Sequence, residues 1–151
     1  MRLNKTIAFI SFTFLFCCSD LNQQLAIAGK NKEEIKTALS EVPKNQIEGM
    51  EWLIKHMPEQ DLKTVTSQFL LENCNLAYKA WIESPWGHYI PDSIFYEYIL
   101  PFANLNEKRD DWREDFYNRF FNMTKEASSS YEAASIINNK MFDAIGVKYS
   151  T

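Results

Sequence analysis

The chain has 151 residues, enough for one domain with a buried core. Its 20 acidic residues outnumber its 16 basic residues, which gives a net charge of −4, and no block of like charge occurs. This balance excludes the usual nucleic-acid-binding proteins, since contact with a phosphate backbone needs clustered lysine and arginine. We expect no nucleic-acid partner.

The first 18 residues have the organisation of a secretory signal peptide. Arg2 and Lys5 precede an apolar run from Ile7 to Cys18 that contains neither a charge nor a proline. The run is too short for a transmembrane helix, which needs roughly 20 apolar residues. We therefore expect the rest of the chain to work outside the cytoplasm.

Two cleavage sites compete within this leader. Leu15–Ser19 resembles a loose bacterial lipobox, in which the cysteine after the apolar run is lipidated and becomes the first mature residue, although the bulky Phe16 departs from the usual small residue. Ala26–Gly29 has the form of an ordinary signal-peptidase site but lies about ten residues beyond the run. We favour lipidation of Cys18, which predicts an outer-membrane or cell-surface lipoprotein attached to the membrane by its lipid. Lipidation of Cys17, or a periplasmic protein cut after Ala28, remains open.

The mature chain has one thiol and a clearer acidic balance. Removing residues 1–18 takes away Arg2 and Lys5, so 16 basic residues become 14 against 20 acidic ones, a net charge of −6. Cys74 is then the only cysteine, so no internal disulfide can form and the fold must depend on packing. Eleven Phe, seven Tyr and four Trp in the whole chain supply the apolar surface for that packing.

Residues 19–146 show helical periodicity and almost no strand alternation, which predicts an all-α domain, an irregular bundle of about five to six helices. We expect the first helix over Asp20–Ser40, weakened by Gly29 in its middle. Asn45–Glu48 has the spacing of a capping box, which predicts a second helix that ends at Pro58.

A third helix is predicted to begin at Thr66 or Ser67 as its N-cap and to end near Ser84-Pro85. Cys74 lies on the apolar face of this helix. After the loop Trp86–Tyr89, Pro91 opens a short aromatic helix over Asp92–Leu100, because proline suits the first turn.

A charged helix is then expected over Glu107–Lys125, with its aromatic face directed inward: Trp112, Phe116, Phe120 and Met123. Ser129–Glu132 has the spacing of another capping box, and Gly146 stands where a C-cap glycine ends the last helix. Residues 147–151 alternate like the start of a strand.

No complete catalytic centre is visible. Cys74, His88 and Asp92 are the one set that would supply a nucleophile, a base and an orienting acid. However, a cysteine on an apolar helix face usually behaves as a small hydrophobe, so we expect Cys74 to be structural. His56 and His88 lie far apart, outside any recognised ligand spacing, so we expect no metal and no cofactor. Carboxylates are plentiful, but no pair stands out.

Several strings, in their order and spacing, resemble the helical region that precedes the catalytic core in bacterial (Bacteroidetes-type) transglutaminase-like proteins. The resemblance covers about Ile35 to Thr151 of this sequence. The strings are Gly49–Ile54, Met57-Pro58, Asp61-Leu62, Phe69–Asn73, Ala77–Trp81, Ile90-Pro91 with Phe95, Leu100–Phe102 and Asn106–Arg113.

The resemblance implies a papain-like core further along, in which a cysteine is activated by a histidine and an aspartate. No residue here matches these three, so no catalytic residue is carried over and the chain is expected not to be an enzyme. We expect a truncated product or split gene in which residues 147–151 lead toward the missing core.

The expected function is that of a non-catalytic helical domain that packs against and supports this core. The predicted docking residues lie in the Trp86–Phe102 region and on the charged segment after it: Trp86, Glu107, Arg109, Trp112 and Arg113. The alternatives are an independent cell-surface helical module that binds glycan or peptide, and a small autonomous enzyme.

Overall fold

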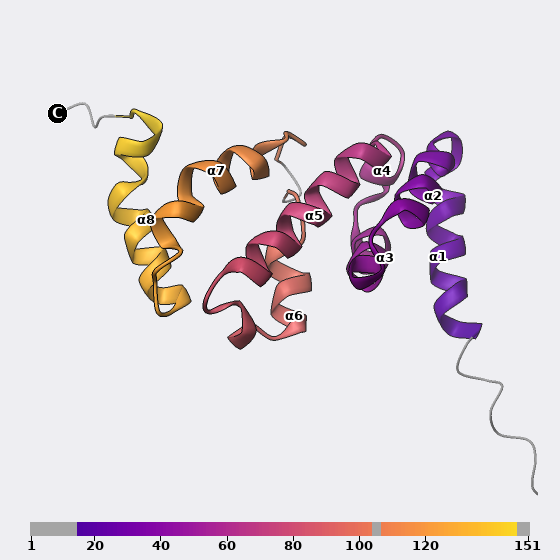
Figure 1. Ribbon diagram of the computed structural model, residues 1–151. Coiled ribbons are helices and arrows are strands. Elements are labelled where there is room, and N and C mark those ends of the chain that lie inside the picture. The colour runs from indigo at the N-terminus through magenta and orange to yellow at the C-terminus, as the bar shows by residue number, and fades with distance from the viewer. Residues whose placement is uncertain (1–14, 104–106, 148–151) are drawn as a thin grey trace, which may run out of the picture.

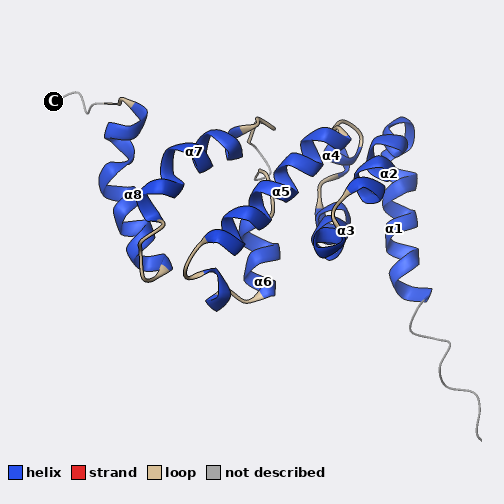
Figure 2. Ribbon diagram, in the orientation of Figure 1, coloured by secondary structure: helices blue, strands red, loops and turns tan. Residues whose placement is uncertain are grey.

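The computed structural model describes residues 15–103 and 107–147, and this part of the chain is helical without strands (Figure 2). The prediction of an all-α fold is confirmed. The elements are α1 (Leu15–Ala28), η1 (Gly29–Asn31), α2 (Lys32–Glu41), η2 (Lys44–Gln46), α3 (Ile47–His56), α4 (Glu59–Leu62), α5 (Ser67–Glu83), η3 (Gly87–Tyr89), α6 (Asp92–Ile94), the π-helix η4 (Phe95–Ile99), α7 (Trp112–Thr124) and α8 (Ser130–Ile145).

The molecule is an elongated row of helices with two unlike parts (Figure 1). Elements α1 to η4 pack on one another and form what we call the bundle, residues 15–103. Helices α7 and α8 pack on each other at the far end of the row from α1 and form the hairpin, residues 112–147. Within the hairpin it is α7 that packs on the bundle, against α5.

The bundle has a closed apolar core. Its largest fully buried side chains come from the successive helices that cross it: Ile35, Met50, Ile54, Leu62, Leu70, Cys74, Phe95 and Leu100. Phe95 makes aromatic contacts with Tyr78 at 4.7 Å and Trp81 at 4.2 Å between ring centroids. The burial of Cys74 confirms its assignment to the core.

The predicted first helix is divided, and that prediction was wrong. Gly29 has φ +58°, a left-handed conformation that ends α1 and that other residues rarely adopt. Asn31 then donates from Nδ2 to the carbonyl oxygens of Leu62 at 3.0 Å and Val65 at 2.8 Å, which fixes the turn against the bundle. The chain therefore folds back, and α2 packs on α1.

The N-terminal predictions fall mainly outside the described residues. Residues 1–14 of the predicted signal lie outside them, and so do the side chains of Cys17 and Cys18, although the backbone of both belongs to α1. None of the helices in the described ranges has the length and apolar composition that crossing a membrane requires. Lipidation of Cys18 stays a prediction.

The helix starts were predicted with mixed success. Thr66 is the N-cap of α5, and its Oγ1 accepts from the Phe69 N–H at 3.2 Å, as expected. The capping box at Asn45 is not formed: Gln46 is the N-cap of α3 and its side chain makes no cap hydrogen bond. The 3₁₀ turn η2 runs directly into α3 and leaves no extended residue to act as a side-chain cap.

The charged helix begins later than predicted, at Trp112 rather than Glu107. Residues 107–111 form no helix, because Arg109 bonds across to the bundle, as described below. The expected inward face is also wrong in part: Phe116 is 48% exposed, and Trp112, Phe120 and Met123 are only half-buried.

The last helix ends as expected and begins with a modified cap. Gly146 has φ +74° and terminates α8. Ser129 Oγ accepts from the Glu132 N–H at 3.2 Å, but the Glu132 carboxylate accepts from the N–H of Ser128 at 2.8 Å rather than from Ser129. Residues 148–151 of the predicted strand start lie outside the described residues, and Val147 belongs to no regular element.

Candidate functional site

Arg113, a predicted docking residue, is bound inside the molecule. Its Nε donates to Oδ1 of Asn73 at 2.8 Å, and its Nη2 donates to the carbonyl oxygens of Ile99 at 2.9 Å and Pro101 at 3.0 Å. Asn73 completes the set, since its Nδ2 donates to the Leu100 carbonyl oxygen at 2.9 Å. The last carbonyls of a helix have no partner within it, and here Arg113 and Asn73 supply donors for those that end η4.

The Arg113 guanidinium has no carboxylate partner within the described part of the chain. Burial lowers its pKa to about 10, so it stays charged at neutral pH. Its charge is balanced by neutral acceptors and by the Trp112 ring, whose centroid lies 4.7 Å from Cζ. A half-buried charge that depends on so many fixed acceptors is costly to disturb.

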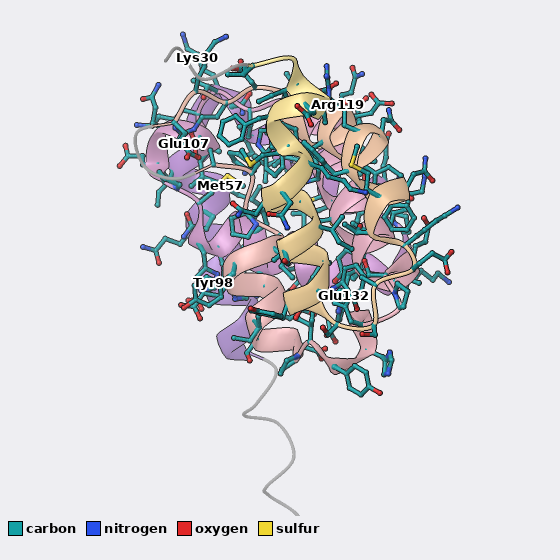
Figure 3. The ribbon with its side chains drawn as sticks, turned by 90° about the vertical axis from the view of Figure 1, so that its left-hand side faces the viewer. Lys30, Met57, Tyr98, Glu107, Arg119 and Glu132 are labelled. Carbon is teal, nitrogen blue, oxygen red and sulfur yellow. The ribbon has the colours of Figure 1, made fainter. Side chains whose placement is uncertain are left out.

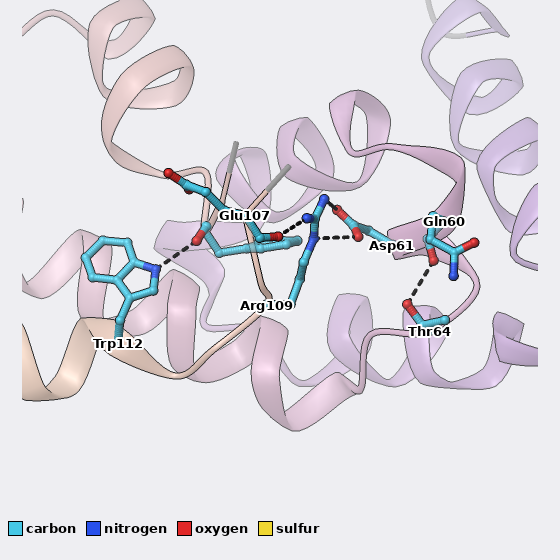
Figure 4. Close-up of polar contacts among 7 residues, drawn as sticks. Gln60, Asp61, Thr64, Glu107, Arg109 and Trp112 are labelled. Atoms are coloured by element: carbon cyan, nitrogen blue, oxygen red, sulfur yellow. Dashed lines mark hydrogen bonds and ion pairs between the residues drawn. The ribbon is translucent and has the colours of Figure 1, made fainter. Parts of the chain in front are cut away.

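Arg109 binds the bundle as well, through the short helix α4 (Figure 4). We call the bonds of Arg113 and those of Arg109 the two clamps. Its Nε and Nη2 donate to the two carboxylate oxygens of Asp61 at 2.8 and 2.9 Å, and Nη1 donates to the Glu107 carbonyl oxygen. Asp61 is only 3% exposed. This paired geometry is the strong form of an arginine–carboxylate interaction. Trp112 adds a third link, because its Nε1 donates to the Phe102 carbonyl oxygen at 2.8 Å.

The segment between bundle and hairpin borders an open depression of about 570 Å³. Residues from both regions predicted to dock line this depression: some belong to the Trp86–Phe102 region and others to the charged segment after it. These are Glu97, Tyr98, Ile99, Pro101, Phe102, Ala103, Glu107, Lys108, Asp110 and Trp112. Figure 3 shows Tyr98 and Glu107 on the same side of α8. Trp86, the remaining predicted docking residue, is half-buried before η3 and does not line the depression.

The hairpin has an aromatic row but no buried core. Phe116 contacts Trp112 at 5.3 Å and Phe120 at 5.5 Å between ring centroids, both edge to face. Yet every Val, Ile, Met, Phe, Tyr and Trp of residues 112–147 remains partly or largely exposed. Only Thr124, Ala127 and Ala133 are buried there.

Contact between hairpin and bundle outside the clamps is largely polar. Lys79 of α5 places Nζ 4.5 Å from the centroid of the Tyr117 ring, and the Tyr117 hydroxyl donates to the Glu83 carboxylate. Partial burial, with the nearby Glu83 charge, raises the pKa of Tyr117 to about 12. These contacts join α7 to α5 and leave Phe116, in the middle of the aromatic row, 48% exposed.

The residues considered for catalysis do not form a centre. Burial raises the pKa of Cys74 to about 12, and the positive charge of Arg113 offsets this only in part, so the thiol is neutral and inert. His88 is exposed, its ring lies 3.8 Å from that of Tyr89 at a tilt of 42°, and no hydrogen bond joins it to Cys74 or Asp92. No group of three potential metal ligands gathers in the described ranges.

Sequence reasoning missed the two partners that explain the arginines, Asp61 and Asn73. The sequence could have predicted a polar contact at Asn73, because this residue interrupts the apolar face that Leu70, Cys74 and Ala77 mark on α5. A polar side chain on such a face must find a partner once it is buried. Nothing in the sequence predicted the contact at Asp61, since this residue follows Pro58 in a short polar segment.

Comparisons with models of protein families, with curated proteins and with solved structures each gave no match to this chain. The resemblance to transglutaminase-like proteins therefore stays a prediction, drawn from the strings quoted above.

Proposed function

We propose that this chain is a non-catalytic helical domain that docks against a transglutaminase-like catalytic core and supports it. The observation that carries the proposal is the hairpin, whose large apolar side chains over residues 112–147 all remain partly or largely exposed. Large apolar side chains left exposed over a whole helical hairpin are typical of an interaction site. A second folded body laid on the aromatic row would complete its burial.

The depression beside the hairpin adds polar and aromatic surface to the same side. Tyr98 is 69% exposed at its rim, and the segment that carries Glu107, Lys108 and Asp110 supplies charges of both signs. An apolar centre with a polar rim is the usual composition of a protein–protein interface.

Arg109 and Arg113 are poor choices for testing the docking proposal, because both hold the fold together. Arg113 and Arg109 bond to the bundle, so their removal would disturb the fold before it reported on docking. Phe116 and Tyr98 are better targets, since both are largely exposed and neither makes a polar contact with the bundle.

The experiment is calorimetric titration of the full chain with a transglutaminase-like core encoded in the same genome, produced separately. We expect Phe116→Ser and Tyr98→Ser each to weaken the association at least tenfold, about 1.4 kcal/mol, as aromatic residues at the centre of an interface do. The thermal unfolding of each variant should stay close to that of the parent chain.

Ile82→Ser is the matched control, because Ile82 is 67% exposed on α5, outside both the depression and the hairpin. It should leave the affinity unchanged. An affinity that Phe116→Ser and Tyr98→Ser also leave unchanged, or the absence of any association, would refute the docking role.

A further inference from the structure

A second hollow lies wholly on the bundle and takes no part in the docking surface. It is an open groove of about 340 Å³, within the size range of small-molecule sites. Five segments meet there, namely η2, α3, α5, α6 and η4. The lining residues, which we call the aromatic groove, are Lys44, Asn45, Glu48, Tyr78, Trp81, Asp92 and Tyr96.

The aromatic side of the groove is held rigidly. One face of Trp81 stacks on the fully buried Phe95, with ring centroids 4.2 Å apart and an interplanar angle of 16°. The Trp81 Nε1 donates to the Gly87 carbonyl oxygen at 2.8 Å. Gly87 fits this position because it has no side chain: a Cβ there would lie 1.8 Å from the Trp81 carbonyl oxygen. The indole is thus fixed before any ligand arrives, which lowers the entropic cost of binding.

Tyr96 stands beside this ring on η4 and is also held by packing. Its ring contacts Phe95 at 5.7 Å and lies nearly parallel to Trp52 at 6.1 Å between centroids. Both Trp81 and Tyr96 are only half-buried, although they pack on the bundle core. They give the groove a rigid apolar wall that remains accessible to solvent.

The lining residues other than the aromatic ones are polar and exposed. The side chains of Lys44, Asn45, Glu48 and Asp92 make no hydrogen bond or ion pair with any described residue. Glu48 and Asp92 offer acceptors, Lys44 offers donors and Asn45 offers both. Hydrogen-bonding groups of both kinds therefore line the same groove as the fixed aromatic rings.

The charges select among ligand classes. Two carboxylates against one ammonium disfavour an anion such as phosphate. Lys44 offsets one of the two carboxylates, which weakens the groove as a site for an organic cation, a ligand that aromatic cages otherwise bind well. A neutral molecule with many hydroxyl groups satisfies donors and acceptors alike, and the C–H face of a sugar ring packs on aromatic faces because these carry partial negative charge.

We propose that the aromatic groove binds a neutral carbohydrate, with one sugar ring against Trp81 and Tyr96. Hydroxyl groups of that ring donate to the carboxylates of Glu48 and Asp92 and accept from Lys44 or Asn45. Such charge-assisted bonds fix the orientation of the sugar. This role is independent of core docking, because no residue of the hairpin lines the groove.

Saturation-transfer difference NMR on the full chain tests this role, with maltotriose, cellotriose, xylotriose, mannotriose and chitotriose as neutral probes. At least one should receive saturation, with the largest transfer to the C–H protons of one ring. The double variant Glu48→Gln, Asp92→Asn should then weaken binding about tenfold or more, because each carboxylate loses a charge-assisted bond.

The matched control is Glu126→Gln with Asp143→Asn, which removes two carboxylates from the hairpin and should leave sugar binding unchanged. Absence of saturation transfer to all five sugars would overturn the proposal. The proposal would also be overturned if the parent chain and the double variant bound the sugar equally well. Saturation transfer to tetramethylammonium, but to no sugar, would overturn it too. The docking experiment uses other residues and another ligand, so either role can fail alone.

Discussion

The bundle and the hairpin use apolar residues in different ways. Helices α2 to η4 enclose side chains that are fully buried, such as Ile54 and Phe95, whereas α7 and α8 carry seven aromatic residues and bury none of them fully. The hairpin is instead tied to the bundle by polar bonds from two arginines near the start of α7. Helical periodicity thus predicts a helix with an apolar face, but it does not predict whether that face is covered within the same chain.

The largest difference should appear when the same side chain is shortened in both parts. Ile54→Ala removes fully buried methyl groups from the bundle and should lower the free energy of unfolding by about 2–5 kcal/mol. Ile137→Ala removes the same atoms from a half-buried site on α8 and should cost about 1 kcal/mol or less. Chemical denaturation followed by circular dichroism measures both.

If Ile137→Ala proved as costly as Ile54→Ala, the hairpin would have a core of its own and the comparison would fail.

The next effect concerns the Arg113 clamp. Arg113→Lys keeps the charge but loses the planar fork that reaches Asn73 and two backbone carbonyls together. The buried Asn73 oxygen is then left without its donor, which should cost about 1–3 kcal/mol of stability. Limited proteolysis should show earlier cleavage in residues 107–147 than in the bundle.

Arg119→Lys is the matched control on the same helix. Arg119 pairs with Asp115 at 2.7 Å one turn away, and both side chains are about half exposed, so the change should cost less than about 0.5 kcal/mol. Equal losses for the two substitutions would mean that Arg113 does not secure the hairpin.

The clamps also mark the limit of what the sequence predicts. Caps and terminators are local, so Thr66 and Gly146 were identified correctly from their immediate neighbours. The partners of Arg109 and Arg113 lie 48 and 40 residues away, and nothing in the local pattern connects them. Both arginines were therefore predicted to dock against a partner rather than to bind the bundle. The sequence did not predict the aromatic groove for the same reason, because its lining residues come from five separate segments.

A smaller effect concerns the pH dependence of the bundle, through its buried thiol. Burial raises the pKa of Cys74 from its ordinary value of 9.0 to about 12, and it also raises the pKa of Tyr78. The unfolded chain therefore releases the Cys74 proton near pH 9 while the folded bundle retains it, so the contribution of Cys74 to stability falls as pH rises from 9 toward 12. The loss from Cys74 should be about 1 kcal/mol at pH 10.

Urea denaturation at pH 8 and pH 10 measures this loss. Cys74→Ala should be less stable than the parent chain at pH 8, because of the cavity, but should lose less further stability at pH 10. An identical pH dependence in both chains would contradict the burial of an ionisable thiol in the bundle.

The smallest effect compares two helix caps of one kind. Thr66→Ala and Ser129→Ala each remove a hydroxyl that accepts from a backbone N–H in the first helical turn, at 3.2 Å in both cases, and each should cost about 1 kcal/mol locally. The consequences should differ, because α5 crosses the bundle core whereas α8 packs mainly on α7. Thr66→Ala should lower the midpoint of global unfolding. Ser129→Ala should leave that midpoint almost unchanged and instead speed hydrogen exchange within α8.

A global loss of stability from Ser129→Ala would show that bundle and hairpin unfold as one unit. The hairpin would then be a part of the bundle rather than a separate unit bound to it.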